Sequence, residues 1–211
     1  MEILSFDLLP STQNYLIEQL KAGQLRAPIA VIALEQSAGI GSRDNEWSGG
    51  KGNFFASIAI LQDQLPSDLP LSSASIYFAY IMKQVLFEYH EHIWLKWPND
   101  FYLNDEKVGG AITKKIDQTL VCGIGINLNN NQNGYSALCV DIHPQSLLQK
   151  YICALKKFPT WKQIFSEYRV EFELSRRFSV HIENQRKSLS DALLEEDGSL
   201  LINGMKVYSL R

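Results

Sequence analysis

The chain has 211 residues, of which 45% are hydrophobic and 20% are charged, as expected for one globular unit with a small additional part. A formal net charge of −3 gives no overall electrostatic reason to bind nucleic acid. The absence of a signal-peptide pattern and of a long apolar run predicts a cytoplasmic protein that does not cross a membrane. The odd number of cysteines, without C-x-x-C spacing, predicts reduced and mostly buried thiols.

The order of helical and β-prone segments predicts a mixed sheet flanked by helices. Pro10-Ser11-Thr12 is typical of a helix start, and Gly23 ends this helix. The polar, glycine-rich stretch 36–53 is predicted to be a long loop between strands 29–34 and 54–61. Further helices are expected over 72–89, 144–156 and 161–177, and further strands over 93–97, 101–103, 108–113 and 120–128.

The pattern changes after residue 177. Short alternating segments follow, and turn residues such as Asp197-Gly198 and Asn203-Gly204 separate them. We therefore expect two domains, residues 1–177 as a larger domain built on the mixed sheet and residues 178–211 as a small β-barrel. Because the second part is too short to be very stable alone, it should dock on the first.

The segment most specific for chemistry is Leu95-Lys96-Trp97-Pro98-Asn99-Asp100, followed by Lys107-Val108-Gly109-Gly110. Taken one residue at a time, it predicts only a strand, an Asn-Asp turn and a hairpin with two surface lysines. The functional interpretation is that Lys96 and Lys107 face one cleft, where they neutralise a carboxylate and the phosphates of a nucleotide. Asn99 and Asp100 could then fix a phosphate or ribose and help to hold Mg²⁺.

This combination resembles the biotin protein ligase family, in which K-W-P-N-D followed by a lysine and a glycine pair is a hallmark. The resemblance is strong from Ser11 to Asn127 and looser beyond. It implies an α+β fold with a class II synthetase-like catalytic domain and a C-terminal SH3-like β-barrel. It also implies that Lys107 is the main catalytic lysine, in contact with the biotin carboxylate and the α-phosphate, and that Arg43 and Lys96 assist it.

Residues 35–47 resemble the ligand-binding loop of that family, G-R-G-R-x-x-R-x-W. The chain departs from the pattern at the three usual arginine positions, which here are Ile40, Ser42 and Asn45. Either Arg43 serves the phosphate, or Lys51, Lys96 and Lys107 carry more of the charge. Trp47 is expected to stack on or cover the adenine ring.

The same matching assigns residues to the two ligands. Ser11-Thr12-Gln13-Asn14 resembles the S-T-N element that binds the ureido head of biotin, and we expect it to cap the helix as well. The expected biotin-binding residues are Ser11, Thr12, Gln36, Gly39, Lys107, Gly110, Ile112, Gly123 and Gly125. The expected ATP- and adenylate-binding residues are Arg43, Trp47, Lys96, Asn99, Asp100 and Asn127, with Asp100 also the candidate Mg²⁺ ligand.

The resemblance implies a ligase that forms biotinyl-5′-AMP from biotin and ATP with Mg²⁺. It would then transfer biotin to a lysine of a biotin carboxyl carrier domain, and a homodimer is possible. A DNA-binding role is disfavoured because active-site residues begin at about Ser11. The alternatives are a lipoate-type ligase, whose R-R-x-S-G-G loop is not visible here, and a noncatalytic biotin-binding module.

Overall fold

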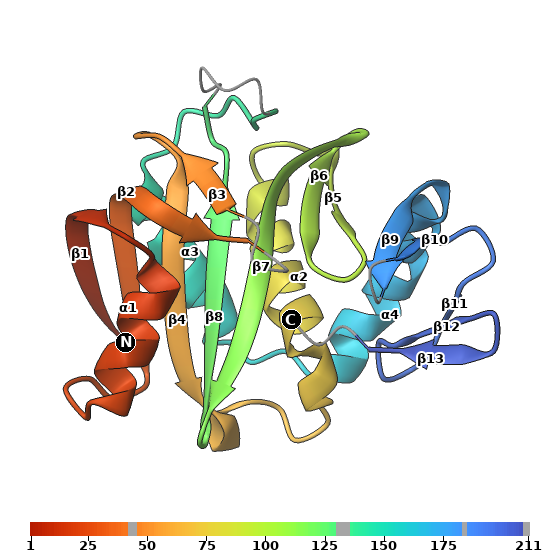
Figure 1. Cartoon of the computed structure of the whole chain (residues 1–211), viewed down its shortest axis with the longest axis horizontal. Helices are drawn as coiled ribbons and strands as arrows, with labels where there is room; N and C mark the ends of the chain where they lie inside the picture. The colour runs from red at the N-terminus through yellow and green to blue at the C-terminus, as the bar shows by residue number, and fades with distance from the viewer. Residues whose placement is uncertain (42–45, 130–135, 183–184, 209–211) are drawn as a thin grey trace.

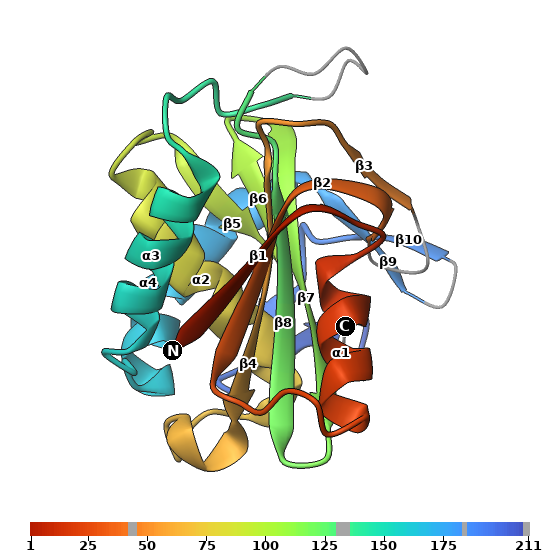
Figure 2. The ribbon, with the colours of Figure 1, turned by 90° about the vertical axis from the view of Figure 1, so that its left-hand side faces the viewer.

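The computed structural model describes residues 1–41, 46–129, 136–182 and 185–208. One large sheet forms the centre of the molecule, with helix α1 on one face and helices α2, α3 and α4 on the other (Figures 1 and 2). The predicted sheet with flanking helices is confirmed. None of the described helices is both long and apolar enough to span a bilayer.

The central sheet has eight strands in the order β1-β2-β4-β8-β7-β6-β5, with β3 paired to β2. Strands β1 and β2 are parallel, and the other pairs among the described strands of this sheet are antiparallel. The strands are β1 (Glu2–Leu9), β2 (Ile29–Ile40), β3 (Glu46–Gly49), β4 (Phe54–Leu61), β5 (Ile93–Lys96), β6 (Asp100–Leu103), β7 (Glu106–Ile116) and β8 (Thr119–Ile126).

Two features of this sheet were not predicted. Strand β1 was not expected, because it is an edge strand whose side chains are mostly exposed or half-buried. The predicted loop 36–53 was wrong in part, because β2 continues to Ile40 and β3 pairs with it, placing Gly39 opposite Trp47. This ribbon is held together by backbone hydrogen bonds. Its glycines and polar residues therefore do not show the alternation of apolar and polar side chains by which a strand is recognised in a sequence. Residues 42–45 of the predicted loop lie outside the described residues.

The two faces of the sheet carry different helices. Helix α1 (Thr12–Lys21) covers a small apolar cluster that includes Leu16 and Val121. On the other face, α2 (Ala74–Phe87) is buried along almost its whole length, because it lies between the sheet and its neighbours α3 and α4. The remaining helices are α3 (Pro144–Leu155), α4 (Trp161–Glu171) and the short 3₁₀ segments η2 (Gln62–Gln64), η3 (Leu71–Ser73) and η4 (Phe172–Arg177). The helix expected over 161–177 is therefore α4 followed by η4.

A buried ion pair ties α4 to the strand that leads into the Lys96–Asp100 segment. Lys83 of α2 pairs with Glu171, and the second oxygen of Glu171 accepts a hydrogen bond from the Leu95 amide at 2.6 Å. Burial raises the pKa of Glu171, while the charge of Lys83 opposes this shift. The cation and the amide donor together satisfy the buried carboxyl group, which fixes the position of β5.

After residue 178 the described chain forms two small sheets rather than one closed barrel. One sheet pairs β9 (Ser179–Ile182) with β10 (Gln185–Ser188), and the other has the order β11-β12-β13 (Leu193–Leu194, Leu200–Ile202 and Met205–Val207). Their apolar residues, such as Val180 and Leu200, belong to the same buried cluster as those of α2 and the sheet. The strands are too short and too few to close on themselves, so they complete a shared core.

One turn joins these small sheets to the rest of the molecule. The backbone carbonyls of three consecutive residues, Glu196, Asp197 and Gly198, accept hydrogen bonds from the side chains of Trp161 (2.8 Å), Ser73 and Trp97 (2.9 Å), respectively. Gly198 has a φ of +77°, and a Cβ there would lie 2.5 Å from Ser73 Oγ. Glycine is therefore required for both backbone conformation and close contact.

Trp97→Phe is expected to lower the free energy of unfolding by about 2 kcal/mol. The substitution leaves the Gly198 carbonyl without its donor and opens a small cavity, since Trp97 is only 1% exposed. Urea unfolding measures the change. Tyr208→Phe, at an exposed position, serves as the control and should leave stability within about 0.5 kcal/mol of the parent.

The cysteine prediction was right for one residue and wrong for two. Cys122 is buried, and burial raises the pKa of its thiol to about 12, which makes it unreactive. Cys139 and Cys153 are exposed. All three are free thiols, as expected.

Candidate active site

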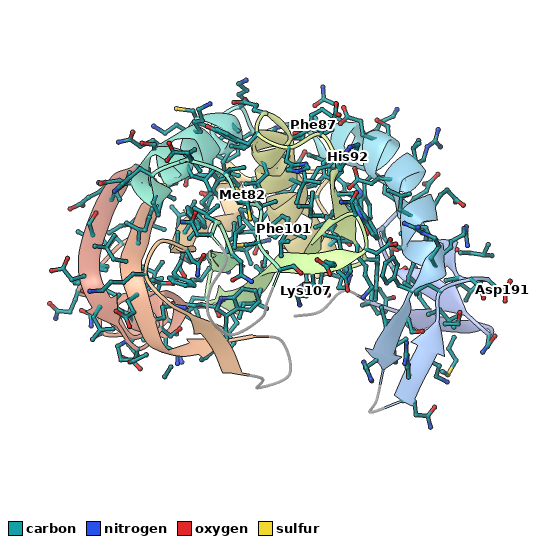
Figure 3. All side chains as sticks on the ribbon, turned by 90° about the horizontal axis from the view of Figure 1, so that it is seen from above. Met82, Phe87, His92, Phe101, Lys107 and Asp191 are labelled. Atoms are coloured by element: carbon teal, nitrogen blue, oxygen red, sulfur yellow. The ribbon has the colours of Figure 1, made fainter. Side chains whose placement is uncertain are left out.

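A cleft opens where the first turn of α1, the β2-β3 ribbon and strands β6, β7 and β8 meet. Seen from above, Phe87 and His92 lie on the side of the sheet that carries helices α2, α3 and α4, and Lys107 lies toward the opposite side (Figure 3). Polar groups gather at both ends of the cleft, and the middle is lined by small and apolar residues. The lining residues are Ser11, Thr12, Gln13, Gln36, Ile40, Gly41, Trp47, Asn99, Asp100, Lys107, Gly110, Ala111, Ile112, Gly123, Ile124 and Gly125.

The floor of the cleft is formed by two paired strands with few side chains. Gly110 of β7 lies opposite Gly125 of β8, and Ile112 lies opposite Gly123. A Cβ on Gly125 would come within 2.9 Å of the Trp47 indole, so this ring packs directly against the backbone of β8. The missing side chain at Gly125 thus lets a flat ring lie against the strand, and at this position that ring is Trp47.

The α1 end of the cleft holds a fixed set of polar groups. Ser11 caps the helix by accepting a hydrogen bond from the Asn14 amide at 3.3 Å. Gln36 Oε1 accepts from both the amide (2.7 Å) and the hydroxyl (3.1 Å) of Thr12. Because its oxygen is engaged twice, Gln36 has its Nε2 group left to act as a donor in the cleft. The predicted cap at Ser11 is confirmed.

Gln13, which was named within the 11–14 element but not among the expected biotin-binding residues, also lines the cleft. Its Nε2 donates to the carbonyls of Ile112 (3.0 Å) and Val121 (3.4 Å), which fixes the amide orientation. Its Oε1 is buried and has no hydrogen-bond partner among the described residues. A buried acceptor without a partner is costly unless a ligand supplies the donor. The available signal was its position directly after Ser11-Thr12.

At the opposite end, three charged side chains form a cluster. Lys107 Nζ lies 2.7 Å from Asp100 Oδ1, and Lys96 Nζ lies 3.9 Å from Asp100 Oδ2. The Lys107 ammonium is also 6.0 Å from the centroid of the Trp47 ring, and its side chain is 39% exposed. Lys107 therefore presents a positive charge to the cleft beside an aromatic face.

Asn99 connects this cluster to the floor. The side-chain nitrogen Nδ2 of Asn99 donates to the Ala111 carbonyl. The backbone carbonyl of Asn99 accepts from the Ala111 amide at 2.9 Å. Its Oδ1 is buried without a partner among the described residues, as is Nε1 of Trp47. Both atoms belong to residues that line the cleft, so both could bind a ligand.

Most of the residues predicted for the site meet in this cleft. Among the described residues, Gly39, Lys96 and Asn127 are not part of its lining. Gly39 lies beside it, opposite Trp47, and Asn127 donates to the Ser136 carbonyl at 3.1 Å. Lys96 is almost completely buried behind Asp100. Arg43 lies outside the described residues.

The candidate Mg²⁺ ligand does not belong to a metal site built by the protein. Among residues 1–41, 46–129, 136–182 and 185–208, no group of three or more His, Cys, Asp or Glu side chains could hold a metal. Asp100 is the acidic residue among those that line the cleft, and Lys107 already occupies one of its oxygens. This donor set does not fit a resident cation.

Comparison with known proteins gives consistent matches. Residues 5–131 match the model of the biotin/lipoate A/B protein ligase family. The bifunctional ligase/repressor BirA of Escherichia coli (strain K12) is 31% identical over an alignment of 128 residues, which covers 57% of this chain and 39% of that protein. The chain thus spans about two fifths of that relative.

In two further relatives, the matched region covers a larger share of the relative's own chain. The biotin–[acetyl-CoA-carboxylase] ligase of Paracoccus denitrificans is 31% identical over 134 residues, covering 57% of this chain and 53% of that protein. The solved structure of biotin acetyl coenzyme A carboxylase synthetase from Helicobacter pylori, with bound biotinylated ATP, has a TM-score of 0.93. It is 38% identical and covers 98% of this chain and 99% of the other. The chain belongs to the biotin/lipoate A/B protein ligase family.

Proposed function

We propose that the protein is an ATP-dependent biotin protein ligase, which forms biotinyl-5′-AMP and then transfers biotin to a lysine of a biotin carboxyl carrier domain. The observation that carries the proposal is the cleft itself, in which a fixed set of amide and hydroxyl groups faces Lys107 across a glycine floor. The Helicobacter pylori relative holds a biotinylated nucleotide, and the Paracoccus denitrificans relative is named for acetyl-CoA carboxylase.

The polar end at α1 suits the cyclic urea of biotin. A urea has one carbonyl acceptor and two N–H donors. Gln36 Nε2 can donate to the carbonyl, and Gln13 Oε1 can accept from an N–H group. Ile112 and the bare strand at Gly123 would then flank the apolar ring and the chain that leads to the carboxylate.

The charged end suits the first chemical step. The biotin carboxylate attacks the α-phosphate of ATP, giving the mixed anhydride and pyrophosphate, so two anions must approach each other. Lys107 offsets this repulsion and stabilises the charge that develops on the phosphate oxygens. In the second step, the amine of the acceptor lysine attacks the acyl carbon and AMP leaves.

Mg²⁺ would arrive with the nucleotide. Because Asp100 is the acidic side chain of the described cleft lining, the protein can contribute little more than one oxygen ligand. ATP phosphates usually supply the other ligands of such an ion. Bound in this way, the ion would neutralise phosphate charge.

A lipoate-type ligase fits the α1 end less well. The dithiolane ring of lipoate has no N–H or carbonyl group, so it would leave the buried Gln13 Oε1 without a donor and would offer no acceptor to Gln36 Nε2. A site built to bond polar groups rejects an analogue without them by several orders of magnitude. We therefore favour biotin as the substrate.

The test is an incubation of the purified protein with biotin, Mg-ATP and a biotin carboxyl carrier domain. Intact mass measurement of the carrier should show the addition of one biotin. Lipoate in place of biotin should give no addition. An unmodified carrier, together with no pyrophosphate release, would overturn the proposal.

Gln13→Met is expected to weaken biotin binding about tenfold, because the variant keeps the length of the side chain and loses its amide. Titration calorimetry measures the affinity. Gln19→Met lies on the same helix outside the cleft and should bind like the parent protein. Parent-like affinity in the Gln13 variant would show that its carbonyl does not contact the ligand.

A further inference from the structure

Lys96 lies behind the cleft and not in its wall. It is 7% exposed, and its ammonium is 5.4 Å from the centroid of the Tyr102 ring and 5.8 Å from that of the Phe178 ring. It forms an ion pair with Asp100, at 3.9 Å. The charge of Lys96 therefore acts on Asp100 and on two aromatic faces rather than on a ligand directly.

The alternation of β5 explains this orientation. Trp94 and Lys96 are two residues apart, so their side chains leave the strand on the same side. The Trp94 ring packs against Tyr102 at 5.2 Å and against Phe178 at 5.5 Å. The Lys96 side chain lies beside the same aromatic rings, and its terminal ammonium is the group that faces Asp100.

Asp100 is shared between two lysines. Lys107 meets its Oδ1 at 2.7 Å, and Lys96 faces its Oδ2 at 3.9 Å. Two ammonium groups and one carboxylate leave one net positive charge at this end of the cleft. With Lys107 and Asp100 alone, the pair would be neutral, and an incoming anion would have to compete with the carboxylate for Lys107.

Phe178 brings the C-terminal segment into this arrangement. It directly follows η4, and its ring stands at 5.1 Å from Tyr102, nearly edge-on. The aromatic faces stabilise a buried ammonium that would otherwise lose its hydration. The position of the Lys96 charge thus depends on a residue beyond the predicted catalytic domain.

We propose that Lys96 and Phe178 are positioning residues: Phe178, together with Tyr102, holds the Lys96 ammonium beside Asp100, and the compensated Asp100 releases Lys107 to meet the anionic group of the substrate. This inference rests on the proposed function. It gives Lys96 a role different from the phosphate contact expected from the sequence.

The first experiment compares an anionic ligand with a neutral one. Biotin and biotin methyl ester are titrated by calorimetry into the parent protein, Lys96→Met and Lys96→Arg. Lys96→Met should bind biotin about tenfold more weakly, in the range seen when a supporting outer-shell group is removed, and should bind the ester unchanged. Lys96→Arg keeps the charge and should retain most of the biotin affinity.

A second experiment tests the link to Phe178. Phe178→Leu should weaken biotin binding roughly threefold, with the ester again unaffected. The double variant with Lys96→Met should be no worse than Lys96→Met alone, because both changes remove one interaction. Val180→Ala, at a buried position of β9, loosens the same segment and should leave the ratio of biotin to ester affinity at the parent value.

The outcomes separate the inference from the function on which it rests. Equal losses for biotin and ester, unchanged biotin affinity in Lys96→Met, or additive effects in the double variant would overturn the positioning roles alone. A parent protein that binds neither ligand and forms no adenylate would instead overturn the proposed ligase function.

Discussion

Replacing Lys107 with methionine should slow biotinyl-AMP formation on the order of 10³-fold, the effect of removing a donor aimed at developing charge. Lys107 is the cation that lines the described part of the cleft, and its loss leaves the carboxylate and the phosphate to approach each other uncompensated. Its side chain is 39% exposed, so folding should change little. Single-turnover release of pyrophosphate measures the step, and urea unfolding measures stability.

Lys115→Met is the matched control for this experiment. Lys115 is an exposed lysine of the same strand, β7, outside the cleft. The control should form the adenylate at the parent rate. An active Lys107→Met variant would move the chemistry away from this cluster altogether.

Gly123→Val should weaken biotin binding on the order of 100-fold or more, while the protein still folds. Even a single Cβ at this position would lie 3.2 Å from Gln13 Cβ and 3.3 Å from Ser57 Oγ, and the branched side chain would also fill the floor of the cleft. Valine suits a strand, so the backbone pairing with β4 and β7 should persist. Calorimetry measures the loss, with circular dichroism as the check on folding.

Thr119→Val, on the same strand but outside the cleft, controls for the added β-branched side chain. It should bind biotin normally. If the Gly123 variant also bound biotin normally, the ligand could not lie along β8.

The charged end of the cleft was predictable because its parts are close in the sequence. Strands β5, β6 and β7 form a meander, so Lys96 pairs with Asp100, and Asp100 pairs with Gly110. Short antiparallel connections place such residues together with little freedom. The motif and the local topology therefore gave the same answer for Asn99, Asp100 and Lys107.

The α1 end required information from distant segments. Thr12 meets Gln36 and Ser57 only after the sheet has assembled. The resemblance to a family, not the residue pattern, predicted that Thr12 and Gln36 each bind biotin, and their contact with each other was not predicted. Gln13 was missed because a glutamine in the first turn of a helix is usually solvated. Its burial follows from the packing of α1 against β4 and β8, which one sequence does not reveal.

The K-W-P-N-D motif also did not predict on which side of β5 the Lys96 side chain lies. Lysines are mostly exposed, so the sequence favoured contact with an anionic ligand. The aromatic neighbours that accommodate it come from three parts of the chain: Trp94 from β5, Tyr102 from β6, and Phe178 from the junction of η4 and β9. Strand β1 was missed for a related reason: an edge strand is recognised from its partner, and its own residues show little alternation.

The turn at 196–198 has a consequence for how this family member can vary. Since its three contacts are accepted by main-chain carbonyls, the side chains of Glu196 and Asp197 contribute nothing to those bonds, whereas each donor, Trp161, Ser73 and Trp97, is identity-dependent. In saturation mutagenesis, most substitutions should therefore be tolerated at Glu196, whereas substitutions of Gly198 and of the two tryptophans should destabilise the protein. Grafting the C-terminal sheets onto a related ligase would then depend mainly on whether the recipient keeps the donors.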